Sequence, residues 1–129
     1  MMRSRTWWAL ACVFGFVSVA GGAFGAHGLK DVVPPERIVT WTVGTTYMQM
    51  HALALLGLAL ARRKMGHRAL DVAGAFFTVG IALFSGSLWL LVLLDLPILG
   101  AITPLGGVCF LLGWGVALFG GWKTMSQPA

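Results

Sequence analysis

Charged residues are scarce in this sequence. They make up 10% of its 129 residues, whereas soluble globular domains carry about 25%. Acidic residues are especially few, with four Asp and Glu against nine Lys and Arg. With 58% hydrophobic residues and a mean hydropathy of +0.86, the chain lacks the polar side chains that would cover a water-exposed surface. The composition therefore excludes an ordinary water-soluble domain.

Cysteine is also scarce, and the usual catalytic motifs are missing. Cys12 and Cys109 both lie inside apolar blocks, where a free thiol behaves as a small buried hydrophobe. The sequence contains no Cys/His cluster with metal-ligand spacing, no Ser/His/Asp set and no phosphate-binding glycine loop. We therefore expect no metal ligand, no cofactor and no catalytic residue, and we predict that the chain is not an enzyme.

The basic residues favour a membrane interpretation over nucleic-acid binding. A net charge of +5 is typical of some nucleic-acid-binding proteins. Here, however, the Lys and Arg residues lie between apolar blocks, and none is interleaved with aromatic residues on a polar face. We expect no nucleic-acid partner.

Four apolar blocks account for most of the chain. They cover about residues 6–26, 42–61, 69–94 and 103–122, and each reaches the roughly 20 residues that a helix needs to cross a bilayer. The first block is too long for the apolar region of a signal peptide, which has about 7–15 residues. The pattern predicts an all-α, integral membrane four-helix bundle, with residues 1–129 as one multi-pass domain in the cell membrane (inner or plasma membrane) and the lipid bilayer as its surroundings.

The distribution of basic residues predicts the orientation of the bundle. Short loops rich in Lys and Arg stay on the cytoplasmic side of a membrane. Only Lys30 and Arg37 lie in the loops on one side, whereas the other side carries Arg3, Arg5, Arg62, Arg63, Lys64, Arg68 and Lys123. We therefore expect the N- and C-termini to be cytoplasmic.

Polar residues within the spans concentrate toward the other, outer side, and they are the candidate site: His51, Tyr47, Gln49, Ser85, Ser87, Thr103 and, at the boundary, His27. At about 1.5 Å per residue, His51 lies near the midplane of a core about 30 Å thick. Tyr47 and His51 share a helical face, while Gln49 lies on the opposite face with Thr42, Thr45 and Thr46. Because this half-span is polar nearly all round, we predict that it is buried in protein or lines water.

The role of His51 stays open between two interpretations. As a structural residue it would be a neutral imidazole bonded to Tyr47 or to a backbone carbonyl. As a functional residue it would mark a permeation or binding site, which is the usual meaning of an ionisable group inside a membrane. A metal ion shared with His27 is not expected, since the two residues differ in depth by about 15 Å. Separately, Gly21 and Gly25 are spaced to let another helix pack closely, either within the bundle or in a second subunit.

Several segments together resemble one family, and they occur in the right order over nearly the whole chain: Gly22–Lys30 (GAFGAHGLK), Tyr47-x-x-x-His51-Ala52-Leu53, Phe84–Leu88 (FSGSL), Thr103–Gly107 (TPLGG) and Gly113-Trp114. The chain resembles domain-of-unknown-function family 423, the YgdD-like small membrane proteins, to which eukaryotic transmembrane protein 256 is similar. The resemblance implies a membrane location and a short multi-span fold, without an activity. Its motif residues here are His27, Tyr47, His51, Ser85, Ser87, Thr103 and Pro104. Gln49 stands one position beyond the Gln that often follows Tyr in the family.

Three functional hypotheses remain. The first is a non-catalytic accessory or structural membrane component, whose polar outer half serves folding and contact with a membrane-protein partner. The second is an oligomeric channel or transporter with an outward-facing polar vestibule around His51. The third is a haem-binding or enzymatic membrane protein. A homo-oligomer is compatible with the first and is required by the second.

Overall fold

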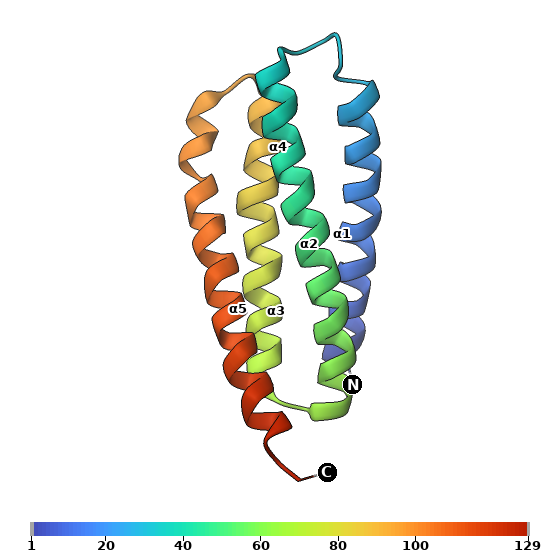
Figure 1. Ribbon diagram of the computed structural model, residues 1–129, viewed down its shortest axis with the longest axis vertical. Coiled ribbons are helices and arrows are strands. Elements are labelled where there is room, and N and C mark those ends of the chain that lie inside the picture. Colours follow the sequence, from blue (N-terminus) through green and yellow to red (C-terminus); the bar gives the residue numbers. More distant parts are fainter. Residues whose placement is uncertain (1, 129) are drawn as a thin grey trace.

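The computed structural model describes residues 2–128 and contains four long helical rods (Figure 1). Helices α1 (Met2–His27) and α2 (Pro35–Met65) form the first two rods. The third rod consists of α3 (Arg68–Gly80), the π-helical turn η1 (Ile81–Ser85) and α4 (Gly86–Leu94). A 3₁₀ turn, η2 (Pro97–Ala101), leads into α5 (Thr103–Met125). Each rod is long and apolar enough to cross a membrane, so the predicted all-α four-helix membrane bundle is confirmed.

Backbone-specific residues mark where the rods begin and end. Pro35 opens α2, where a missing N–H costs nothing because the first helical turn has no internal partners. Gly66 ends α2 with a φ of 68°, a left-handed conformation that glycine adopts without strain. Asp95 ends α4 in the same region, with a φ of 51°. Because the connections at these points are short, consecutive rods run antiparallel.

The rods form an asymmetric bundle. Helix α1 packs mainly against α2, and α5 packs mainly against α3, so that α1 and α5 lie on opposite sides of a central pair (Figure 1). Leu55 of α2 and Ala73, Phe77 and Ile81 of the third rod are almost completely buried between them. The apolar centre of the molecule is therefore built around α2 and the third rod.

Small residues on α1 allow a close approach to neighbouring tryptophans. A Cβ atom on Gly25 would lie 2.6 Å from Nε1 of Trp41, and one on Gly21 would overlap the ring of Trp89. The two indoles stack at 4.5 Å between ring centroids, and Trp41 Nε1 donates a hydrogen bond to the Gly21 carbonyl at 2.7 Å. The predicted close packing at Gly21 and Gly25 is confirmed, and it occurs within one chain.

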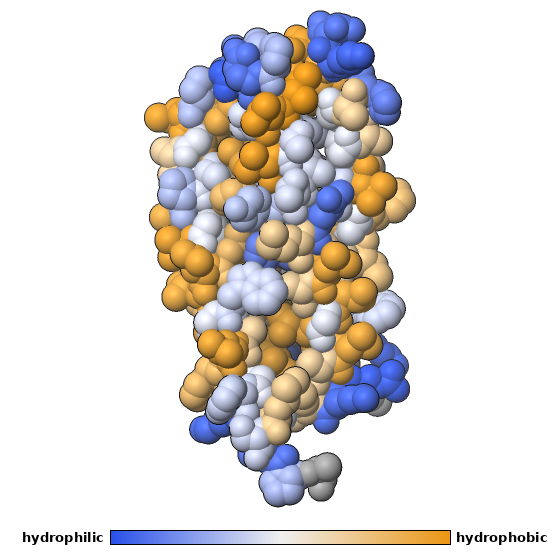
Figure 2. Space-filling model, in the orientation of Figure 1, coloured by the Kyte–Doolittle hydropathy of each residue, from blue (hydrophilic) through white to orange (hydrophobic). Residues whose placement is uncertain are grey.

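Both ends of the chain lie at the same end of the bundle (Figure 1). Figure 2 shows hydrophilic residues gathered at the two ends of the visible face, with mostly apolar and intermediate residues between them. This is the surface pattern of a protein whose middle contacts hydrocarbon.

The cytoplasmic position of both termini is a testable prediction. In a variant that lacks Cys12 and Cys109, we expect a cysteine at Asp31 to react with a membrane-impermeant thiol reagent on intact cells, because this loop carries few basic residues. A cysteine at Ser126 is expected to react only after the membrane is opened. Labelling at 126 and protection at 31 would reverse the orientation.

Candidate functional site

His51 is buried near the middle of α2, with 1% of its surface exposed. Its Nδ1 lies 2.7 Å from the backbone carbonyl oxygen of Tyr47, and its Nε2 lies 3.0 Å from the indole Nε1 of Trp114. A carbonyl oxygen only accepts and an indole N–H only donates hydrogen bonds. His51 therefore carries its single proton on Nδ1, is neutral, and has both ring nitrogens occupied.

Three aromatic rings pack against the imidazole of His51. The ring of Phe110 stacks on the imidazole with centroids 3.6 Å apart and planes 10° apart. Phe77 meets it edge-on at 5.2 Å, and Trp114 does so at 6.0 Å. We call His51, Phe77, Phe110 and Trp114 the His51 cage. These rings and the two hydrogen-bond partners pack around an imidazole that is almost completely buried.

Of the two hydrogen-bond partners suggested for His51, the Tyr47 side chain and a backbone carbonyl, the structure shows the carbonyl. The carbonyl of Tyr47 bonds the imidazole, whereas the phenol ring of Tyr47 is 38% exposed and packs on Phe84 at 4.6 Å between centroids. Sequence reasoning missed Trp114 as the second partner. Depth gives a signal for it, because Trp114 lies 11 residues, or about 16 Å, from the outer end of α5 and is therefore level with His51.

This geometry predicts how three substitutions behave. His51→Leu and Trp114→Phe are each expected to lower the free energy of unfolding by about 1–2 kcal/mol. Their effects are expected to be non-additive, because both remove the same hydrogen bond. Tyr47→Phe is the control, since it preserves the carbonyl that binds Nδ1. Unfolding in mixed detergent micelles, followed by circular dichroism, compares the parent, the three single variants and the double variant His51→Leu/Trp114→Phe. A large loss in Tyr47→Phe, or additive losses in the other pair, would contradict the bonding pattern.

Ser87 and Thr103 join two helices near the end of the bundle opposite the termini. Their hydroxyl oxygens lie 2.7 Å apart, and Ser87 also lies 2.9 Å from the carbonyl oxygen of Phe84. With one proton each, Ser87 donates to the carbonyl and Thr103 donates to Ser87. Ser85 is fully buried in η1, and its hydroxyl finds no partner among residues 2–128. Ser87 and Thr103 link α4 to α5, and none of the three residues makes a hydrogen bond to His51.

The remaining candidates do not join a common site. His27 is exposed at the end of α1. Gln49, Thr42 and Thr46 are exposed on the surface of α2, whereas Thr45 is buried. Residues 2–128 of one chain thus leave part of this polar half-span uncovered, and its burial in protein or contact with water stays a prediction. One physical reason for this exposure is that threonine can satisfy its hydroxyl locally, as Thr42 does by donating to the Ile38 carbonyl at 2.9 Å.

A second polar cluster, at the end that holds both termini, was missed by sequence reasoning. The Asp71 side chain is 7% exposed, and it accepts hydrogen bonds from Trp7 Nε1 at 2.9 Å, Arg62 Nε at 2.9 Å and Arg3 Nη1 at 3.1 Å. These contacts join α1, α2 and α3. The sequence does contain a signal for this cluster. Asp71 is a lone carboxylate in the first turn of a span, on the side where all other charged side chains are basic.

Metal ligation has no evident place within residues 2–128. No three His, Cys, Asp or Glu side chains in that part of the chain approach one another closely enough to hold an ion. Cys12 and Cys109 are free thiols.

Comparison of the sequence with known proteins identifies the family of the chain. The model of a family described as "Protein of unknown function (DUF423)" matches residues 21–107, a range that includes every predicted site residue but not Trp114. The chain is 43% identical over 106 residues to the UPF0382 membrane protein YwdK of Bacillus subtilis, covering 81% of this chain and 86% of that protein. It is 40% identical over 119 residues to the UPF0382 inner membrane protein YgdD of Escherichia coli K12, covering 92% and 91%. No solved structure matches. The chain therefore belongs to DUF423, a family of small membrane proteins.

Proposed function

We propose that the chain is a non-catalytic structural or accessory component of the cell membrane, and that the core of its bundle conducts no solute. The name of the Escherichia coli relative, an inner membrane protein, supports an inner-membrane location. The observation that carries the proposal is the state of His51, whose two nitrogens are both hydrogen-bonded within the His51 cage. Both hydrogen-bonding atoms of this buried histidine are thus used within the protein, and neither is free for a ligand.

Catalysis or proton transport by His51 would require access of substrate or water to the imidazole, and the His51 cage excludes both. A general acid or base must reach the proton it transfers within about 2.6–3.2 Å, directly or through one water. A proton pathway through side chains needs ionisable groups that face water or one another. Phe110 stacked at 3.6 Å leaves no room for substrate or water on that face of His51. The geometry therefore favours the structural interpretation of His51 over a vestibule around it.

Liposome flux measurements test this proposal. We expect vesicles containing the purified protein to show no more proton or solute flux than empty vesicles, and His51→Leu to leave that background unchanged. Flux that appears with the parent protein and disappears in His51→Leu would overturn the proposal in favour of a channel. A Soret absorption band in the purified protein would overturn it in favour of haem binding.

A second proposal concerns assembly, and Gln49 supports it. The side chain of Gln49 is exposed beyond the midplane, and its amide has no hydrogen-bond partner among residues 2–128. An amide offers two donors and an acceptor oxygen, and hydrocarbon cannot satisfy them. Two copies of the chain related by a two-fold axis would pair their Gln49 amides, which is worth about 0.6–2 kcal/mol between membrane helices. We propose a homo-oligomer that uses this face of α2.

Energy transfer between labelled copies in lipid vesicles tests the assembly. Gln49→Leu is expected to weaken association severalfold, whereas Thr42→Val, on the same face, is expected to leave it unchanged because Thr42 bonds its own helix. Equal association in the parent and Gln49→Leu would contradict pairing through Gln49.

A further inference from the structure

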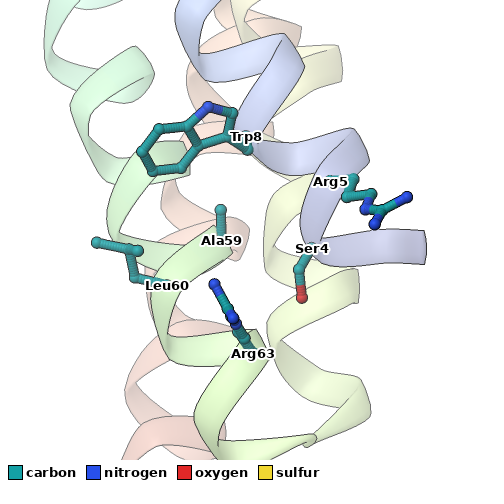
Figure 3. A pocket seen from close by; sticks show the side chains of 6 residues that line it. All are labelled: Ser4, Arg5, Trp8, Ala59, Leu60 and Arg63. Carbon is teal, nitrogen blue, oxygen red and sulfur yellow. The ribbon is translucent and has the colours of Figure 1, made fainter. Parts of the chain in front are cut away.

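A groove opens between α1 and α2 at the end of the bundle that holds both termini. It has a volume of about 380 Å³ and is lined by Ser4, Arg5, Trp8, Ala59, Leu60 and Arg63. Figure 3 shows the Arg63 side chain extending along α2 toward Ala59, between Leu60 and Ser4, while the Arg5 side chain extends outward from α1 beside Ser4. We call this the terminal groove. Its location is independent of the His51 cage and of the proposed function.

The charges at this end leave the two arginines of the terminal groove without carboxylate partners. Asp71 is the one acidic residue at this end, and it is already engaged by Arg3 and Arg62. The other acidic residues, Asp31, Glu36 and Asp95, belong to the loops and helix ends at the opposite end. Among residues 2–128, neither Arg5 nor Arg63 forms an ion pair. Two arginines on neighbouring helices therefore border one groove without a carboxylate counter-ion among residues 2–128.

The groove changes from basic to apolar with depth. Ser4 and Arg5 of α1 and Arg63 of α2 lie at its rim. Trp8 and Leu60 lie about one helical turn further into the bundle on the same two helices, and they are 47% and 54% exposed. Further along the same seam, Cys12, Phe16 and Leu56 line a second, mostly apolar groove of about 520 Å³. The seam thus offers a cationic mouth that continues into a long apolar wall.

This sequence of surfaces matches one class of ligand. A guanidinium group binds phosphate oxygens through a planar pair of donors, tryptophan prefers the membrane interface, and the apolar wall suits acyl chains. Basic pockets between membrane helices on the cytoplasmic side bind acidic lipid headgroups. A free phosphate ion would bind only at the basic rim and would make no contact with the apolar wall. We propose that the terminal groove binds an anionic phospholipid, with its phosphodiester at Arg5 and Arg63 and its acyl chains along Trp8 and Leu60.

The phosphodiester of the lipid and the proposed Gln49 contact lie at different depths, although Gln49 also borders the second groove. Gln49 lies 14 residues before Arg63 along α2, or about 21 Å, which is beyond the midplane of a core about 30 Å thick. A lipid that enters at the terminal groove belongs to the leaflet on the side of the termini. Both contacts are therefore compatible with one surface of the chain.

Native mass spectrometry of the delipidated protein in detergent tests the site, with dioleoyl phosphatidylglycerol and dioleoyl phosphatidylcholine as probes. We expect the parent protein to prefer phosphatidylglycerol. The double variant Arg5→Gln/Arg63→Gln is expected to lose about 25-fold in affinity for it, at roughly fivefold for each basic residue near an acidic headgroup. Arg63→Lys retains the charge without the planar donor pair, and we expect it to lose part of the preference while keeping the parent's helicity.

Lys64→Gln/Arg68→Gln is the matched control, because it removes the same charge at the same end but outside the terminal groove. We expect it to bind phosphatidylglycerol like the parent. An equal loss in this control would show a general charge effect and overturn the proposal. Displacement of the lipid by millimolar inorganic phosphate would also overturn it, since a free anion would then be sufficient to occupy the rim.

Discussion

Replacing Asp71 by Asn is expected to lower the free energy of unfolding by about 3 kcal/mol, near the lower end of the range for breaking a buried ion pair. The substitution keeps the size of the side chain but removes the charge that Arg62 and Arg3 share. Arg62 would be left 18% exposed, without a counter-ion and facing an amide. The loss is not larger because Arg3 is 61% exposed and can turn to water. Unfolding in mixed micelles, followed by circular dichroism, measures the effect.

Asp95→Asn provides the control for Asp71→Asn. Asp95 also pairs with an arginine, Arg37, at 3.0 Å, but its side chain is 84% exposed, and exposed pairs contribute about 0–1 kcal/mol. Asn also tolerates the left-handed backbone at this position. We expect little change in stability. Equal losses in the two variants would mean that burial at Asp71 does not set the strength of its ion pairs.

The sequence was sufficient to predict the four rods and the depth of His51. Length and hydropathy decide whether a helix crosses a bilayer, and rise per residue converts position into depth. Neither quantity depends on how the helices are rotated about their axes. The burial of His51 follows in the same way, because an ionisable group near the midplane is too costly to leave facing lipid.

The partners of the polar residues were not predictable, because they depend on helix rotation. A membrane helix is apolar on all sides, so hydrophobic periodicity does not reveal its inner face. On α5, Phe110 is 4% exposed while Trp114, one turn later, is 47% exposed yet still reaches His51. Asp71 was overlooked for a related reason. In the sequence, Arg3 and Arg62 act as topology signals. In the structure, both side chains also donate hydrogen bonds to the Asp71 carboxylate.

The polar half-span of α2 shows that polar side chains in a membrane helix are not all alike. Thr42 and Thr45 donate to carbonyls one turn earlier in their own helix, so a threonine-rich face can meet hydrocarbon with its hydroxyls satisfied. An amide such as Gln49 lacks that solution. Polar residues in a membrane helix therefore differ in whether they require a partner from another helix.

The π-helical turn η1 has no signature in the sequence, and a glycine on α5 shows what it does. A Cβ atom on Gly106 would lie 2.7 Å from Cβ of Phe84 and 2.8 Å from its Cα, and it would overlap the backbone nitrogen of the same residue. These atoms belong to η1, where the wider turn displaces the backbone. Backbone atoms cannot rotate aside as a flexible side chain does, so only glycine at this position permits the observed approach.

Gly106→Ala is accordingly expected to destabilise the protein by about 1–3 kcal/mol, the usual cost of overpacking a tight core. Gly107→Ala is the matched control, because its new Cβ atom would lie 3.9 Å from the Phe84 ring, an ordinary contact distance. We expect the control to be neutral or stabilised by up to about 1 kcal/mol, since Ala favours helix over Gly. Thermal unfolding in detergent, measured by circular dichroism, compares the two neighbours directly.

The hydrogen bond between Ser87 and Thr103 identifies the cause of any loss in Gly106→Ala. It joins α4 to α5 at 2.7 Å, close to the contact at Gly106, and it would lengthen if the added methyl group pushed α5 away from η1. Combining Gly106→Ala with Ser87→Ala is therefore expected to cost less than the sum of the two single effects, because the first substitution has already weakened what the second removes. Equal stability of Gly106→Ala and Gly107→Ala would show that α5 does not approach the backbone of η1 as closely as the structure places it.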